Sequence, residues 1–168
     1  EFTLALSDVV PVLECLGMRA VSERPYKLHV RDSPGIQDVT VAWINEFVME
    51  YTHEGTFDMD VLQTCFQEAF KRVWFDEAEN DNFNQLVLTA GLDWRQIGMI
   101  RAYAKYFKQI GVAFSQEYME SALVQHSEIA ADIVQLFETR FCTGTVSARD
   151  KKVTRIKKAI FAALEDVS

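Results

Sequence analysis

The chain of 168 residues has the length of one domain, or of one small domain with a helical extension. Its hydrophobic content of 49% provides enough apolar side chains for a core, which excludes an intrinsically disordered chain. The formal net charge of -8 at pH 7 opposes the electrostatic attraction behind most nucleic-acid binding, so we expect no nucleic-acid partner.

The first fifty residues mix a helical pattern with an extended one. Apolar residues recur at helical spacing over residues 8–16, with Ser7 as the expected N-cap and Gly17 as the residue that ends the helix. Pro11 falls in the expected first turn, where a missing N–H costs no hydrogen bond. We therefore predict one short helix that begins at residue 8.

The chain after this helix has the alternation that is typical of half-buried strands. In residues 18–30, Tyr26, Leu28 and Val30 alternate with polar residues and form the expected buried face. The run from 39 to 51 also places its apolar side chains on one face. We expect three strands around the one helix, as in part of a small α+β sandwich. The apolar residues of the second run are Val39, Val41, Trp43, Phe47, Met49 and Tyr51.

From Gly55 onward the apolar period changes from two to about three and a half residues, which predicts helices. Asp93 and Gln96 form a capping-box pattern at the start of one helix, and Gly111 follows its end. Residues 56–168 are therefore expected to be essentially all helical. We predict helices at residues 59–75, 83–90, 94–110, 116–124, 128–141 and 153–167.

The cysteines and the hydropathy pattern favour a reducing cytoplasm. Cys15, Cys65 and Cys142 are far apart, with no C-x-x-C pair and no histidine at a ligand-like spacing, so we expect buried thiols instead of a redox or metal site. No stretch approaches the roughly 18 consecutive apolar residues of a membrane span, and the first residues lack the pattern of a signal peptide. We predict a soluble cytoplasmic protein, or a soluble piece of one, without a membrane partner.

Two interpretations are open for the basic side of the helix at residues 94–110. Arg101, Lys105 and Lys108 share one face, opposite an apolar face. They could bind phosphate or another anion, or they could form the solvated face of an ordinary amphipathic helix. Because nothing rich in glycine precedes the helix to cradle a phosphate, the sequence favours the solvated face.

A denser basic cluster lies near the end of the chain. It surrounds a single acid, Asp150, and could be either a docking face for an acidic neighbouring domain or a charged surface that aids solubility. Charge runs are usually solvated, so the second interpretation is favoured. The basic residues are Arg149, Lys151, Lys152, Arg155, Lys157 and Lys158.

No pattern in the chain indicates catalysis. His29, His53 and His126 are isolated, and the sequence contains no H-E-x-x-H pair, no G-x-S-x-G elbow, no G-x-G-x-x-G and no Walker lysine. The acids of FDEAENDNFN lack the spacing of a calcium loop and predict a solvated turn. We expect no catalytic, cofactor-binding or metal-binding residue in this chain.

Long stretches nevertheless carry a family resemblance. Residues 6–26 (LSDVVPVLECLGMRAVSERPY), the strand with Trp43 and Ile44, and residues 66–141 (FQEAFK to ETRF) closely resemble the large bacterial NAD-dependent glutamate dehydrogenases. In that family these segments lie upstream of the catalytic portion. The resemblance implies that residues 1–53 are part of an ACT-like regulatory domain, and that residues 56–168 are a helical domain leading toward an absent catalytic domain.

The resemblance implies that this chain belongs to an enzyme but does not itself catalyse the reaction. The parent enzyme would convert L-glutamate, NAD and water to 2-oxoglutarate, ammonia and NADH, while this chain alone is expected to be inactive and to bind no cofactor. Its implied partners are the remaining domains and subunits of a homo-oligomeric parent, and an amino-acid effector near the loops after Leu16 and Pro25. The alternative is a free-standing protein-interaction or amino-acid-sensing module.

Overall fold

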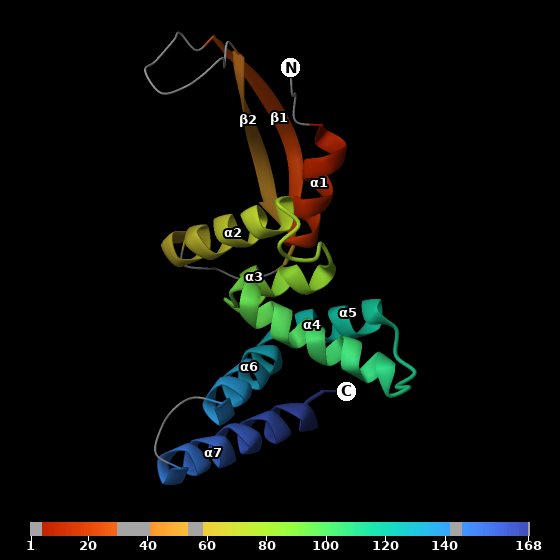
Figure 1. Cartoon of the computed structure of the whole chain (residues 1–168), viewed down its shortest axis with the longest axis vertical. Helices are drawn as coiled ribbons and strands as arrows, with labels where there is room; N and C mark the ends of the chain where they lie inside the picture. The colour runs from red at the N-terminus through yellow and green to blue at the C-terminus, as the bar shows by residue number, and fades with distance from the viewer. Residues whose placement is uncertain (1–4, 30–40, 54–58, 142–145, 168) are drawn as a thin grey trace.

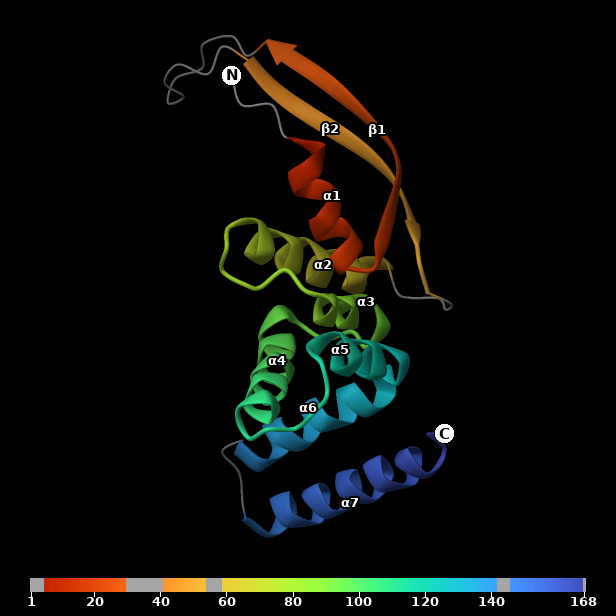
Figure 2. The same cartoon turned by 90° about the vertical axis from the view of Figure 1, so that its right-hand side faces the viewer.

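The computed structural model describes residues 5–29, 41–53, 59–141 and 146–167. A β-hairpin and its neighbouring helix occupy one end of the long axis, the helices follow in layers, and the last helix lies at the other end (Figures 1 and 2). In chain order the elements are α1 (Leu6–Cys15), β1 (Met18–His29), β2 (Val41–Tyr51), α2 (Met59–Trp74), the 3-10 turn η1 (Asn82–Gln85), α3 (Leu86–Thr89), α4 (Trp94–Gln109), α5 (Gln116–Gln125), α6 (Ser127–Phe141) and α7 (Val146–Glu165).

The hairpin confirms the α+β class but corrects the number of strands. β1 pairs antiparallel with β2 from Met18 opposite Tyr51 to His29 opposite Val41. Because residues 18–29 form one continuous strand, the sheet in the described residues has two strands instead of three. α1 lies beside the hairpin and contacts β1, so the small α/β unit sits on top of the helical region (Figure 2).

A break in the strand register decides which side chains of the hairpin are covered. Ala20 pairs with Met49 and Ser22 with Val48, so Val21 is an extra residue in β1. Beyond it Tyr26 is opposite Ile44, and both are about half exposed. The prediction that Tyr26 and Leu28 lie on the buried face is therefore wrong. Residues that are paired across two strands point to the same face of the sheet, and the face with Tyr26 and Ile44 is the outer one. The predicted face of β2 is half-buried where it is described: Val41, Trp43, Phe47, Met49 and Tyr51.

α1 begins earlier than its sequence pattern indicates. The helix starts at Leu6 with Ala5 as its N-cap, so Ser7 is not the cap and lies inside the first turn. Pro11 consequently lies in the helix interior, where it removes one backbone hydrogen bond. Gly17 ends the helix as predicted, with a φ of 85° that favours glycine. Its carbonyl accepts hydrogen bonds from the backbone N–H and the hydroxyl of Thr52, which joins α1 to the end of β2.

The main core joins the α/β unit to the helical region. Leu16 at the end of α1 is fully buried with Phe83, Leu86 and Val87 of η1 and α3. Each apolar side chain removed from water contributes about 1.5–3 kcal/mol, so this cluster supplies a large part of the folding free energy. The remaining core residues come from α1, α2, α3, the connection between α3 and α4, α4 and α6: Val12, Ala69, Val73, Leu88, Leu92, Ile97, Ile100, Ala104, Ala130 and Val134.

The helices of the second half confirm most of the predicted ranges. Differences at the ends are one or two residues, except for α7, which begins at Val146 instead of at residue 153. Asp93 and Gln96 make the predicted capping box, and Gly91 and Gly111 have the positive φ of helix-ending glycines. Ser115 caps α5 by accepting a hydrogen bond from the N–H of Tyr118.

Removing the cap of α4 should weaken the fold measurably. The Asp93 carboxylate accepts hydrogen bonds from the N–H groups of Arg95 and Gln96, at 2.8 and 2.9 Å. Asp93→Ala should lower the free energy of unfolding in urea by about 1 kcal/mol, while Asp93→Asn should retain most of it. As a control, Asp150→Ala removes an exposed carboxylate inside α7 and should cost less than about 0.5 kcal/mol. Equal losses for the two alanine variants would contradict a capping role.

Candidate functional site

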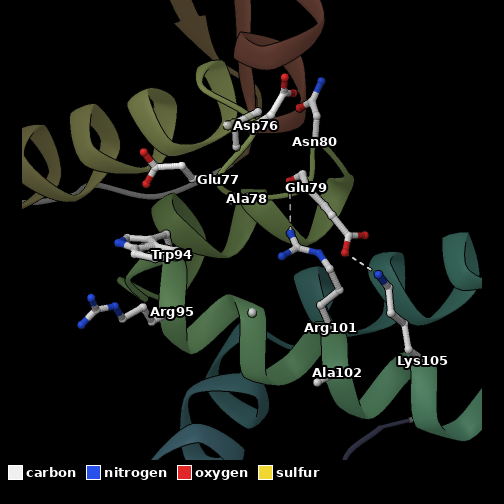
Figure 3. A pocket seen from close by; sticks show the side chains of 12 residues that line it. Asp76, Glu77, Ala78, Glu79, Asn80, Trp94, Arg95, Arg101, Ala102 and Lys105 are labelled. Carbon is white, nitrogen blue, oxygen red and sulfur yellow. Dashed lines mark hydrogen bonds and ion pairs between the residues drawn. The ribbon is translucent and has the colours of Figure 1, made fainter.

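A polar segment between α2 and η1 faces α4. A cavity of about 770 Å³ lies between them. Figure 3 shows Arg101 and Lys105 extending from α4 toward Glu79, with Trp94 and Arg95 at the start of the helix. The cavity is lined by Val73, Asp76, Glu77, Ala78, Glu79, Asn80, Trp94, Arg95, Gly98, Arg101, Ala102 and Lys105.

Arg101 is buried, which corrects its predicted place on a solvated face. Its Nε donates to Asp81 Oδ2 at 2.6 Å, and its Nη2 donates to Asp81 Oδ1 at 2.8 Å. Nη2 also reaches Asn84 Oδ1 at 3.0 Å. The Arg101 and Asp81 side chains are only 7% and 11% exposed. A two-point guanidinium–carboxylate pair of this kind holds the segment before η1 against α4.

The spacing along α4 contains a signal for this burial. Ile97, Ile100 and Ala104 are buried, and Arg101 lies among them at the three-and-four spacing of one helix face. An arginine within an apolar stripe needs an acceptor, and the acidic segment before η1 provides Asp81. The prediction failed because it assigned every charge on the helix to solvent. The acidic segment itself is exposed at residues 76, 77, 79 and 80, as predicted, but not at Asp81.

The same network extends to α5. Asn84 donates to the backbone carbonyl of Glu79 at 2.9 Å, and Asn82 donates to Glu120 at 3.1 Å. Glu120 is buried and also accepts from Gln116 at 2.8 Å. Side chains from the segment before η1, from η1 and from α5 therefore satisfy one another, as buried polar groups must.

The other cations around the cavity also have partners or stack on an aromatic ring. Lys105 pairs with Glu79, and both are about half exposed. The guanidinium groups of Arg72 and Arg95 both lie over the Trp94 ring, 4.9 and 5.1 Å from its centroid. The hydrogen bonds that Arg72 donates to Glu77, and then to Glu68, raise the pKa of Arg72 above its ordinary value. The charges at the cavity are thus largely balanced, and the arrangement favours a structural junction over an anion site.

The histidines and cysteines do not come together in one site within the described residues. His53 Nε2 lies 2.8 Å from Gln85 Oε1, and His126 is the C-cap of α5. Cys15 and Cys65 are free and partly buried, and burial, followed by the charges of Asp81 and Glu120, raises the pKa of the Cys15 thiol. Cys142 and the His29 side chain lie outside the described residues.

The described ranges contain neither a metal-binding cluster nor a membrane-spanning helix. No three His, Cys, Asp or Glu side chains there lie close enough together to hold a metal ion. No helix in the same ranges is long and apolar enough to cross a bilayer. The proposed effector site near a loop after Pro25 needs correction, because Pro25 pairs with Asn45 within the hairpin and no loop begins there.

The terminal basic cluster is separate from this cavity. On α7, Lys151, Lys152 and Arg155 are exposed, and Arg149 is half-buried. Arg149 and Lys157 line a smaller hollow of about 360 Å³ between α7 and the end of α6. The structure therefore places part of this cluster at a concave surface instead of on a uniformly solvated face.

Comparison with known proteins shows the class that this fold represents, a segment that combines an ACT-type unit with a helical motif. Residues 1–62 match the family model described as glutamate dehydrogenase, ACT3 domain, and residues 78–143 match glutamate dehydrogenase, helical motif 3. The chain belongs to the glutamate dehydrogenase family.

Three relatives show what share of a glutamate dehydrogenase this chain covers. The chain is 41% identical over 167 residues to the NAD-specific glutamate dehydrogenase of Pseudomonas aeruginosa, covering 98% of this chain and 10% of that protein. The corresponding enzyme of Halomonas elongata is 42% identical over 138 residues (82% and 8%), and that of Mycobacterium tuberculosis is 34% identical over 156 residues (88% and 9%). The chain thus spans about a tenth of the length of these relatives or less.

Proposed function

We propose that this chain is a non-catalytic regulatory and scaffolding segment of an NAD-dependent glutamate dehydrogenase. The observation that carries the proposal is the match to two different glutamate dehydrogenase regions along one chain, together with 41% identity over 98% of it. The proposed division is an ACT-like part at residues 1–53 and a helical part at residues 56–168. The parent reaction would oxidise L-glutamate with NAD and water to 2-oxoglutarate, ammonia and NADH, in the cytoplasm.

The packing of the chain supports a scaffolding role. Leu16 of α1 shares one buried cluster with Phe83 and Leu86, so the ACT-like and helical parts are joined by a common core instead of a free linker. The Arg101–Asp81 pair fixes the segment before η1 against α4. A segment built in this way can transmit a fixed orientation from one neighbouring domain to another. Binding of an amino-acid effector remains a separate prediction, which calorimetric titration with a panel of amino acids would test.

An activity measurement tests the non-catalytic role directly. The 168-residue chain, incubated with L-glutamate and NAD, should give no NADH above a buffer blank when absorbance at the NADH band is followed. The complete parent enzyme, assayed beside it at equal molar concentration, is the positive control. NADH formation by the chain alone would overturn the non-catalytic assignment, and an inactive parent would overturn the proposed reaction.

A further inference from the structure

An apolar groove runs between α4, α5 and α6, on a part of the surface that the polar junction does not use. Its volume is about 780 Å³. Aromatic side chains form much of its wall, and three of them are more than half exposed: Phe114, Tyr118 and Phe141. Phe114 stacks on Tyr118 with ring centroids 5.0 Å apart, and Phe137 contacts Phe141 at 4.7 Å. Exposed apolar surface gathered in one concave place marks a binding site.

The charge at the groove indicates which charged group a bound partner must carry. Among the residues that the structure describes, Arg140 is the only charged one that lines the groove, and it makes no ion pair with any of the others. Arg140 also borders the hollow that contains Arg149 and Lys157, with Asp150 as its one acid. This rim is therefore basic, although the chain as a whole has a net charge of -8. A partner that fills the groove needs an acidic residue beside Arg140.

The walls of the groove also indicate the secondary structure of a bound partner. Apart from Val112 and Phe114, which lie in the connection between α4 and α5, the lining residues belong to helices. The backbone N–H and C=O groups of a helix are bonded within it, so an extended peptide would find no strand edge to pair with. A helix satisfies its own backbone and presents apolar side chains at three-and-four spacing to a groove. A second copy that used the same surface in a symmetric contact would add a second Arg140 to the interface and no acidic residue from the groove lining to balance it.

We propose that this groove binds an amphipathic helix from another part of the parent glutamate dehydrogenase, with an Asp or Glu of that helix beside Arg140. The inference rests on the proposed function, because the helix must come from the roughly nine tenths of the parent that this chain does not represent. The apolar stripe of the helix covers Phe114, Tyr118 and Phe141, and its acidic residue balances the basic rim.

Photo-crosslinking in the complete parent enzyme identifies the occupant. The photoreactive amino acid p-benzoylphenylalanine replaces Tyr118 in the groove or, as a control, the exposed Lys71 of α2, and the crosslinked peptides are identified by mass spectrometry. The expected result is a crosslink from position 118 to an amphipathic segment of the parent that carries an acid. No crosslink above the Lys71 control, or a crosslink only to the groove of a second copy, would overturn the proposal.

Charge substitution tests the role of Arg140. Arg140→Glu should lower the crosslinking yield at position 118 about fivefold, while Arg140→Lys should retain it. Replacing the acid of the crosslinked segment with Arg should restore the yield in the Arg140→Glu enzyme. An unchanged yield in Arg140→Glu would show that the pair does not form. NADH formation by the parent is measured separately, so an active parent without the crosslink would reject this inference and leave the proposed function standing.

Discussion

Arg101→Met should lower the free energy of unfolding by about 3 kcal/mol, because it leaves the Asp81 carboxylate in a largely buried place without its cation. The substitution also removes the donors to Asn84 and to the Glu79 carbonyl. Methionine keeps much of the side-chain length, so the loss of packing is small. Urea unfolding followed by circular dichroism measures the change in midpoint and slope.

A matched control comes from the next turn of the same helix. Lys105 pairs with Glu79 where both side chains are about half exposed, so Lys105→Met should cost less than about 1 kcal/mol. In addition, the double variant Arg101→Met with Asp81→Asn should lose less unfolding free energy than the two single variants together, because it leaves no unpaired charge. Equal losses for the Arg101 and Lys105 variants, or simple additivity in the double variant, would contradict the buried pair.

Phe83→Ala should destabilise the chain by about 3–5 kcal/mol, since it creates a cavity in the cluster that joins the α/β unit to the helices. Phe83 is completely buried. A domain of this size is usually stable by about 5–15 kcal/mol, so the variant should be close to unfolding at physiological temperature. Thermal unfolding followed by circular dichroism should show a large decrease in Tm.

The chain offers an exposed phenylalanine for comparison. Phe75, just after α2, is 62% exposed, so Phe75→Ala removes the same atoms from a place that water already reaches. This variant should change the free energy of unfolding by about 0.5 kcal/mol or less. A similar decrease in Tm for both variants would show that Phe83 is not part of the central core.

Local signals in the sequence determined most of the helical half. The capping box of Asp93 and Gln96 and the helix-ending Gly91 and Gly111 act over one turn of chain, so their effect can be read without knowing what packs nearby. The same holds for the apolar period of α2, which depends only on one helix having a buried face. The family resemblance is likewise a property of the sequence, and the comparisons confirm it.

Only the tertiary structure decided the features that depend on distant partners. The register break at Val21 turns Tyr26 outward, and the break exists only because β1 pairs with β2. In most of these pairs the two residues are more than twenty positions apart in the sequence. Arg101 is buried because Asp81 and Asn84 are brought to the same face of α4. The apolar groove exists because α4, α5, α6 and the connection between α4 and α5 bring their apolar side chains together around one hollow. Each of these results requires two segments to meet in space. Spacing along one segment can show that Arg101 needs an acceptor, but it does not show which distant residues provide one.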